Sequence, residues 1–117
     1  MNLEDAARKH SEWKVNFFKA IATKSQVDAA SICRDDRCEL GKWLHGAGHG
    51  THGLLPGFQE CIERHAAFHT EAGKVASAIN AGKMEEATKL LNGGTPYAAA
   101  STAVVGAIQA LRRQAGA

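Results

Sequence analysis

The sequence is poor in several features that define other classes of protein. It has only two prolines, aromatic residues make up 6% of its 117 residues, and no stretch approaches the roughly 18 apolar residues of a membrane span. Its first residues show no basic segment followed by an apolar one, the pattern of a secretion signal. We therefore expect a cytoplasmic protein that does not enter a membrane.

Charge and cysteine content exclude two further classes. Fourteen basic and twelve acidic residues leave a net charge of only +2, and they are interspersed, so the sequence lacks the basic patch typical of nucleic-acid binding. The three cysteines are an odd number in a chain without a secretion signal. This favours reduced thiols or metal ligands over a disulfide framework.

What the sequence does have is the composition and length of one folded domain. Hydrophobic residues make up 44% and charged residues 22%, which is ordinary globular usage. A chain of this length buries enough surface to fold without disulfides. We expect residues 1–117 to form a single domain.

Hydrophobic spacing predicts helices throughout, because no segment alternates with period two. Long amphipathic helices are predicted over residues 3–24, over 56–80, and from Thr95 and Pro96 onward, where threonine is the N-cap and proline the first helical residue. The stripe of the last helix is formed by Tyr97, Ser101, Val104, Ile108 and Leu111.

Shorter elements are predicted between the long helices. Asp36 and Glu39 form a capping-box pattern that starts a helix over about 37–46, and a short helix follows Gly82. The segment 24–34 is predicted to be a loop with room for one helical turn, and the glycine-rich segment up to about Leu55 a flexible loop. The fold predicted is all-α: an antiparallel bundle of about four main helices with an additional short helix.

Three histidines fall in the apolar stripes of two long helices. His65 and His69 are four residues apart, so they share a helix face in the stripe between Phe58 and Ile79, and His10 lies in the centre of the first stripe. A pair of histidines on a helix is by itself a weak signal for a metal. Three imidazoles facing one core, however, need a common partner, because burying an unpaired polar group is costly.

Cys38 is the natural fourth ligand. We expect it at the second position of its helix, where free backbone N–H groups and the helix dipole favour a thiolate. The plain alternative is a small buried hydrophobic residue, the usual role of a single cysteine. Together the four residues predict a zinc site.

Three segments of the chain resemble the chemoreceptor zinc-binding domain family. They are residues 38–44, which read Cys-Glu-Leu-Gly-Lys-Trp-Leu, residues 10–14, which read His-Ser-Glu-Trp-Lys, and the His-x3-His segment 65–69. The resemblance covers nearly the whole chain. It implies a helical bundle with a zinc site of three histidines and one cysteine, in which His10, Cys38, His65 and His69 are the ligands.

The same resemblance implies a homodimer that regulates chemotaxis receptors or diguanylate cyclases. It gives Gly41 and Trp43 structural roles, the glycine allowing close approach of helices and the indole packing. The 117 residues include no signalling coiled coil and no GGDEF-type catalytic segment, so we expect either a fragment of a longer protein or a free-standing domain that acts on a separate partner.

Four protein ligands leave no open position for substrate, so we expect a sensor and not an enzyme. The signal is either zinc itself or an oxidant such as hypochlorous acid attacking Cys38. A structural zinc in an interaction module is a third interpretation, and a hydrolytic site with three histidines and a water is a fourth, disfavoured by the apolar surroundings.

The remaining histidines and cysteines are interpreted as accessory. His45, His49 and His52 lie in the glycine-rich segment and are expected to be solvated; the alternative is a second metal site formed by these histidines. Cys61 is one turn before His65 and within range of the same face, but it is expected in the core. Cys33 is expected to be a bystander thiol or a resolving partner for oxidised Cys38.

Overall fold

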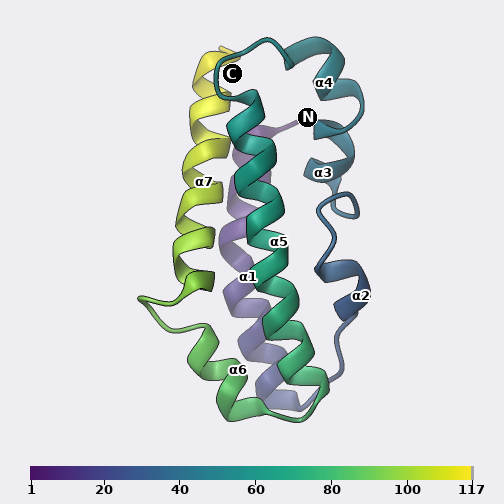
Figure 1. The fold of residues 1–117 in the computed structure, drawn as a ribbon, viewed down its shortest axis with the longest axis vertical. Coiled ribbons are helices and arrows are strands. Elements are labelled where there is room, and N and C mark those ends of the chain that lie inside the picture. The colour runs from purple at the N-terminus through teal and green to yellow at the C-terminus, as the bar shows by residue number, and fades with distance from the viewer. Residues whose placement is uncertain (117) are drawn as a thin grey trace.

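The computed structural model describes residues 1–116, which contain helices and no strand. The elements in chain order are α1 (Leu3–Thr23), α2 (Ala29–Ile32), α3 (Glu39–Leu44), α4 (Ala47–His52), α5 (Phe58–Asn80), α6 (Met84–Leu90) and α7 (Pro96–Gln114) (Figure 1). The predicted all-α bundle is confirmed, including the helical turn within residues 24–34 and the short helix after Gly82.

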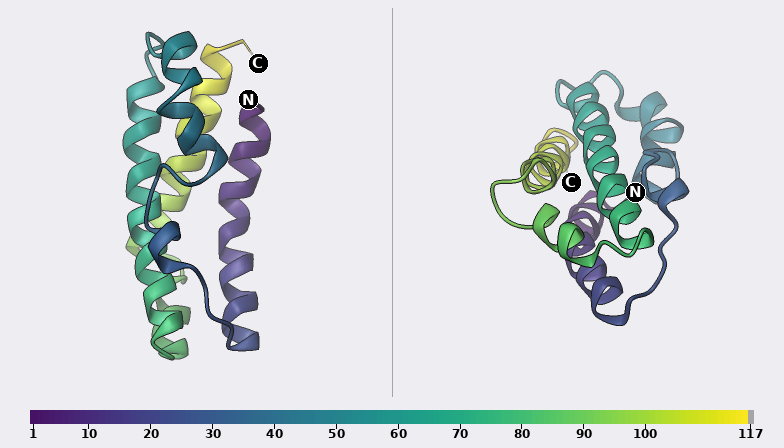
Figure 2. Two further views of the ribbon diagram at one scale, coloured as in Figure 1. Left: turned by 90° about the vertical axis from the view of Figure 1, so that its right-hand side faces the viewer. Right: turned by 60° about the horizontal axis from the view of Figure 1, so that its bottom comes forward.

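Four antiparallel runs make up the bundle. α1 and α5 run in one direction and α7 in the other, and the fourth run is the returning segment that carries α2, α3 and α4 (Figure 1). Figure 2 shows this segment passing along one side of α1 and α5, and α2 and α3 both pack on α5. We call residues 25–38 the strap, because they are the part of this run that leads to Cys38.

The core lies between the three long helices and is filled by aromatic and branched side chains. Its largest fully buried members are Phe17, Phe58, Phe68, Leu40, Leu44, Ile79, Leu91, Ile108 and Leu111. The apolar stripe of α7 points into this core, with Tyr97, Val104 and Ile108 all buried within the one chain. That stripe is therefore used inside the monomer and does not form a surface for a second copy.

Of the two helix starts predicted from capping residues, that of α7 is confirmed and that of α3 is wrong. Thr95 caps α7, its Oγ1 accepting from the Ala98 N–H at 3.2 Å, with Pro96 as the first helical residue. The Asp36 capping box is not formed: Cys38 itself is the N-cap of α3, and the Asp36 carboxylate instead pairs with Arg34. A cap two residues later makes α3 shorter than predicted.

The glycine-rich segment is not the predicted flexible loop, because residues 47–52 form α4. Gly48 is buried under the Trp43 indole, and a Cβ at that position would lie 2.5 Å from the ring. Trp43 also contacts His52, with ring centroids 5.1 Å apart. A glycine here allows close packing, and the contact with Trp43 orders the segment.

Gly41 has the role that the family resemblance implied for it. A Cβ on Gly41 would overlap the carbonyl oxygen of Asp35 in the strap. The glycine thus lets α3 fold back against the end of the strap, which places Cys38 between them.

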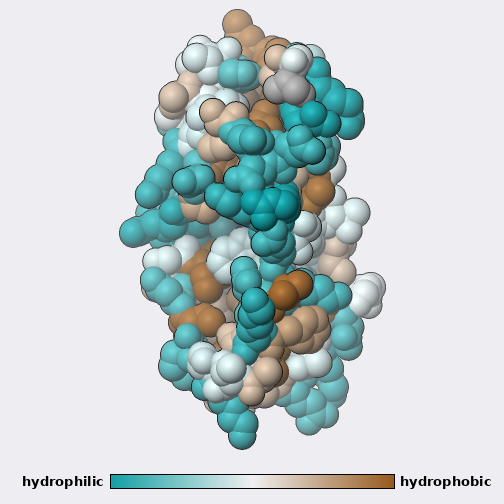
Figure 3. All heavy atoms as spheres, turned by 180° about the vertical axis from the view of Figure 1, so that it is seen from behind, coloured by the Kyte–Doolittle hydropathy of each residue, from teal (hydrophilic) through white to brown (hydrophobic). Residues whose placement is uncertain are grey.

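The face behind the view of Figure 1 is mainly hydrophilic, with small apolar spots between polar side chains (Figure 3). Within residues 1–116, none of the helices combines the length and the apolar character that crossing a membrane requires.

Candidate metal centre

Four side chains from three parts of the fold converge on one point. His10 comes from α1, Cys38 from the end of the strap, and His65 and His69 from consecutive turns of α5. One donor atom from each lies within 4.8 Å of the donor atoms of all the others. The structure therefore brings together all four residues that the sequence singled out.

The separations of these atoms suit a tetrahedral ion. Cys38 Sγ lies 3.2 Å from His65 Nε2, 3.6 Å from His69 Nε2 and 4.0 Å from His10 Nε2, and the Nε2 atoms of His65 and His69 are 3.0 Å apart. Zn–N and Zn–S bonds of about 2.0–2.1 and 2.3 Å in a tetrahedron separate the ligand atoms by about 3.3–3.6 Å. The donor set fits zinc in both kind and spacing.

Two of the imidazoles are oriented by backbone carbonyls. His10 Nδ1 donates to the Ala6 carbonyl at 2.7 Å, and His69 Nδ1 donates to the Ile32 carbonyl at 2.8 Å. A carbonyl only accepts, so each ring must carry its proton on Nδ1, which leaves the Nε2 lone pair facing the cluster. This is the tautomer that a metal ligand needs.

His65 has no such support. It is fully buried, and its Nδ1 has no hydrogen-bond partner among the described residues. A buried polar atom without a partner lowers the folding stability by about 1–3 kcal/mol. The stability of the fold therefore does not explain why a histidine occupies position 65. Its position is explained if its Nε2 binds an ion.

Burial keeps the three rings neutral. Desolvation lowers the pKa of His65 to about 2, with the neighbouring His69 as the next cause, and it also lowers the pKa values of His10 and His69. The hydrogen bonds to Ala6 and Ile32 oppose this shift only in part. Two neutral nitrogens 3.0 Å apart repel each other through their lone pairs unless a proton or a cation lies between them, and burial disfavours the proton.

Cys38 differs from the sequence prediction in its electrostatics. It accepts a hydrogen bond from the Gly41 N–H at 3.4 Å, which lowers its pKa, but burial is the larger effect and raises the pKa above the ordinary value. The helix N-terminus therefore does not by itself make Cys38 a thiolate, contrary to the prediction from the sequence. A bound metal would be needed to displace the proton.

The surroundings are dry on one side and open on the other. Phe68 contacts His10 and His69, with ring centroids 5.5 and 5.4 Å apart, and Trp13 lies edge-on to His69. On the outer side, a cavity of about 390 Å³ between α1 and α3 reaches His10 and Cys38. Small molecules can thus approach the cluster from the side of the cysteine.

The other histidines and cysteines lie outside the cluster. Cys61 is buried in the core, where burial raises its pKa to about 11, and Cys33 is exposed. His45 pairs with Asp35 at 2.9 Å, while His49 and His52 lie on α4. The described residues contain no second group of three possible ligands.

Sequence reasoning missed the parts of the site that are not side-chain ligands. The Ile32 carbonyl orients His69 from 37 residues away, and nothing in the sequence marks a backbone oxygen for this role. The role of the Ala6 carbonyl could have been predicted from helix geometry, because Ala6 lies one turn before His10 on the same helix.

A comparison with protein-family models agrees with this geometry. The model of the chemoreceptor zinc-binding domain matches residues 10–76, which is more than half of the chain and includes all four clustered residues. The chain belongs to this family. No curated protein and no solved structure matches it.

Membership makes this a zinc-binding signalling domain, with zinc as its cofactor. The family match begins at His10 and ends within α5, so it covers the strap and α3 but not α6 or α7. The matched part is thus the part that builds the cluster, and α7 completes the core around it.

Proposed function

We propose that this chain is a cytoplasmic sensor in which His10, Cys38, His65 and His69 bind one zinc ion. The observation that supports the assignment is the convergence of three Nε2 atoms and one Sγ on one point, from elements far apart in the sequence. When bound, zinc supplies a Lewis-acidic centre that needs neutral imidazoles and a thiolate as ligands. His10 and His69 are already held in the required tautomer by Ala6 and Ile32.

Signalling is favoured over catalysis by the number of ligands. Four protein ligands close a tetrahedral site and leave no position for substrate or an activated water. The four ligands belong to α1, the strap and α5. Whether zinc is bound at the site therefore determines how these three elements pack. We propose that this packing is passed to a chemotaxis receptor or a diguanylate cyclase, in the same or a separate chain.

A redox signal is the second candidate, and one observation favours it. Cys38 is the oxidisable member of the cluster and is only partly buried, and the cavity between α1 and α3 reaches it. Hypochlorous acid would oxidise the thiolate to sulfenic acid and release chloride, which removes the anionic ligand. Zinc sensing and redox sensing would then share one site.

We also propose a homodimer, on the strength of family membership, and one experiment tests this together with the zinc assignment. Native mass spectrometry of the zinc-loaded protein should show two chains with two zinc ions, one per chain. Zinc-free protein that takes up no added zinc would contradict the proposed function. A monomer with one zinc would remove the dimer alone, whereas zinc that does not exchange with a chelator would favour a structural ion.

A further inference from the structure

We propose that Gly73 and Asn80 are positioning residues for the zinc site, because they dock the strap on α5 and so hold the Ile32 carbonyl on His69. This inference rests on the ligand assignment proposed above. It adds that docking of the strap and binding of zinc are coupled. Zinc binding then also orders the strap at the C-terminal end of α5, where no ligand lies.

The first contact is at the site itself. His69 Nδ1 donates to the Ile32 carbonyl at 2.8 Å, and Ile32 is the last residue of α2. The orientation of a ligand on α5 is therefore set by a backbone atom of the strap. If the strap moves away, His69 loses the bond that fixes its ring and its tautomer.

Gly73 makes this contact possible. It lies one turn after His69 on α5 and is buried against Cys33, the residue that follows Ile32. A Cβ on Gly73 would lie 2.5 Å from the Cys33 Cβ and 3.1 Å from its Cα. Backbone atoms cannot give way as a flexible side chain does, so an alanine would push the strap away from α5.

Asn80 holds the other end of the strap. Its Oδ1 accepts from the Val27 N–H at 2.8 Å and its Nδ2 donates to the Val27 carbonyl at 2.7 Å. One side chain thus satisfies both backbone groups of a strap residue. Docking is completed by Val27 and Ile32, which pack against the core while half-buried.

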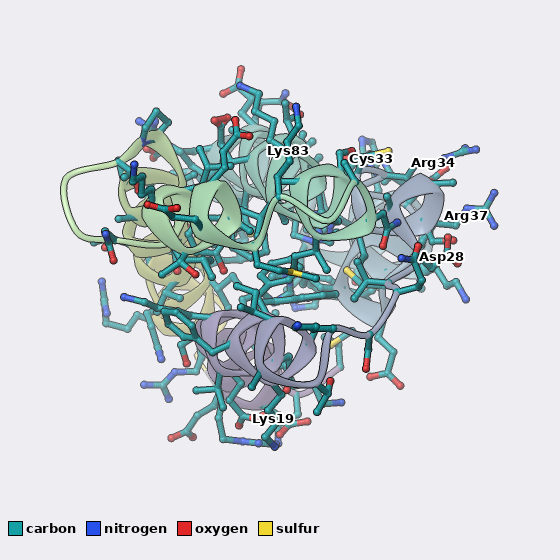
Figure 4. The ribbon with its side chains drawn as sticks, turned by 90° about the horizontal axis from the view of Figure 1, so that it is seen from below. Lys19, Asp28, Cys33, Arg34, Arg37 and Lys83 are labelled. Carbon is teal, nitrogen blue, oxygen red and sulfur yellow. The ribbon has the colours of Figure 1, made fainter. Side chains whose placement is uncertain are left out.

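The arginines of the strap do not contribute to this docking. Arg34 and Arg37 both pair with Asp36 within the strap. Seen from below, Arg34 and Arg37 project away from α5 (Figure 4). The contacts that hold residues 27–33 on α5 are neutral, and they centre on Gly73 and Asn80.

Coupling between the two sites must act in both directions. If docking of the strap strengthens zinc binding, zinc binding strengthens docking by the same factor. The charged outer face of residues 28–37 would then be ordered in a zinc-dependent way.

The test measures zinc affinity in two variants of the full chain, with a control for each. Gly73→Ala should bind zinc about 10- to 100-fold more weakly, the usual loss when the group that orients a ligand is disturbed. Asn80→Ala should lose about fivefold, because it acts from further away. Gly106→Ala, on the exposed face of α7 with nothing within 4 Å of a Cβ, and Asn92→Ala, in an exposed turn, should bind like wild type.

Two further readouts separate positioning from a general loss of stability. In the zinc-loaded wild type, the His69 Nδ1 proton should be seen in a long-range ¹H–¹⁵N spectrum as slowly exchanging, and it should exchange rapidly in Gly73→Ala. Hydrogen exchange of the Val27 amide should slow on addition of zinc. If Gly73→Ala does not fold, Asn80→Ala and the Val27 amide decide the matter.

Wild-type affinity in folded Gly73→Ala and Asn80→Ala, or a Val27 amide indifferent to zinc, would overturn the inference and leave the zinc site intact. Failure of the wild type itself to bind zinc would overturn the proposed function as well.

Discussion

Cys38→Ser is expected to weaken zinc binding by about 100-fold or more, which corresponds to about 3 kcal/mol. In the proposed site the thiolate is the one anionic ligand, and a serine hydroxyl stays neutral at pH 7. The same variant should release no zinc in response to hypochlorous acid, because it has no oxidisable ligand. Zinc release is measured with a chromogenic chelator, and affinity by competition with the same chelator.

Serine is the informative replacement because Cys38 is also the N-cap of α3. Serine is a good N-cap and keeps the bond to the Gly41 N–H, whereas alanine would remove the cap together with the ligand. Cys33→Ser, at an exposed thiol, is the matched control and should bind zinc normally. Normal affinity in Cys38→Ser would show that Cys38 is not a ligand. Weak binding without oxidant-driven release from the wild type would leave zinc sensing and remove redox sensing.

His65→Leu is expected to separate stability from zinc binding. Zinc at a thousandfold excess over its dissociation constant should stabilise the wild type by about 4 kcal/mol, or about 15 °C in Tm for a domain of this size. The leucine variant should lose this response. Without zinc, however, it should be more stable than the wild type by about 1–2 kcal/mol, because it removes a buried polar ring whose Nδ1 has no partner.

The measurement is thermal and urea unfolding of both proteins, with zinc and with chelator. His49→Leu serves as the control, since His49 is an exposed histidine outside the cluster, and it should keep the full zinc response. A His65→Leu variant that still responds to zinc would exclude His65 as a ligand. One that is less stable than zinc-free wild type would mean that His65 contributes to packing and is not kept for the ion.

Much of the fold was predictable because it follows from local rules. The long helices α1, α5 and α7 have sustained apolar stripes, and Thr95 and Pro96 mark the start of α7 by their chemistry alone. The short elements were harder. Asp36 fits the sequence pattern of an N-cap, but its carboxylate pairs with Arg34. The thiol of Cys38 caps the helix instead, by accepting a hydrogen bond from the Gly41 N–H.

The site was predictable in its side chains and not in its supports. His10, His65 and His69 stood out because a histidine in an apolar stripe needs a partner, and the structure brings all three to Cys38. The packing of Gly48 under Trp43, which orders α4, depends on a contact between two helices that no local pattern encodes. Gly73 likewise gives no signal within α5, since its role exists only once Cys33 lies against it.

X-ray absorption at the zinc edge tests the central claim most directly, because it counts the ligand atoms and identifies them by distance. For the zinc-loaded wild type, we predict three nitrogens at about 2.0–2.1 Å and one sulfur at about 2.3 Å, with the imidazole scattering typical of histidine. In Cys38→Ser the sulfur shell should disappear. A wild-type spectrum without sulfur, with two sulfurs, or with fewer than three histidines would contradict the account.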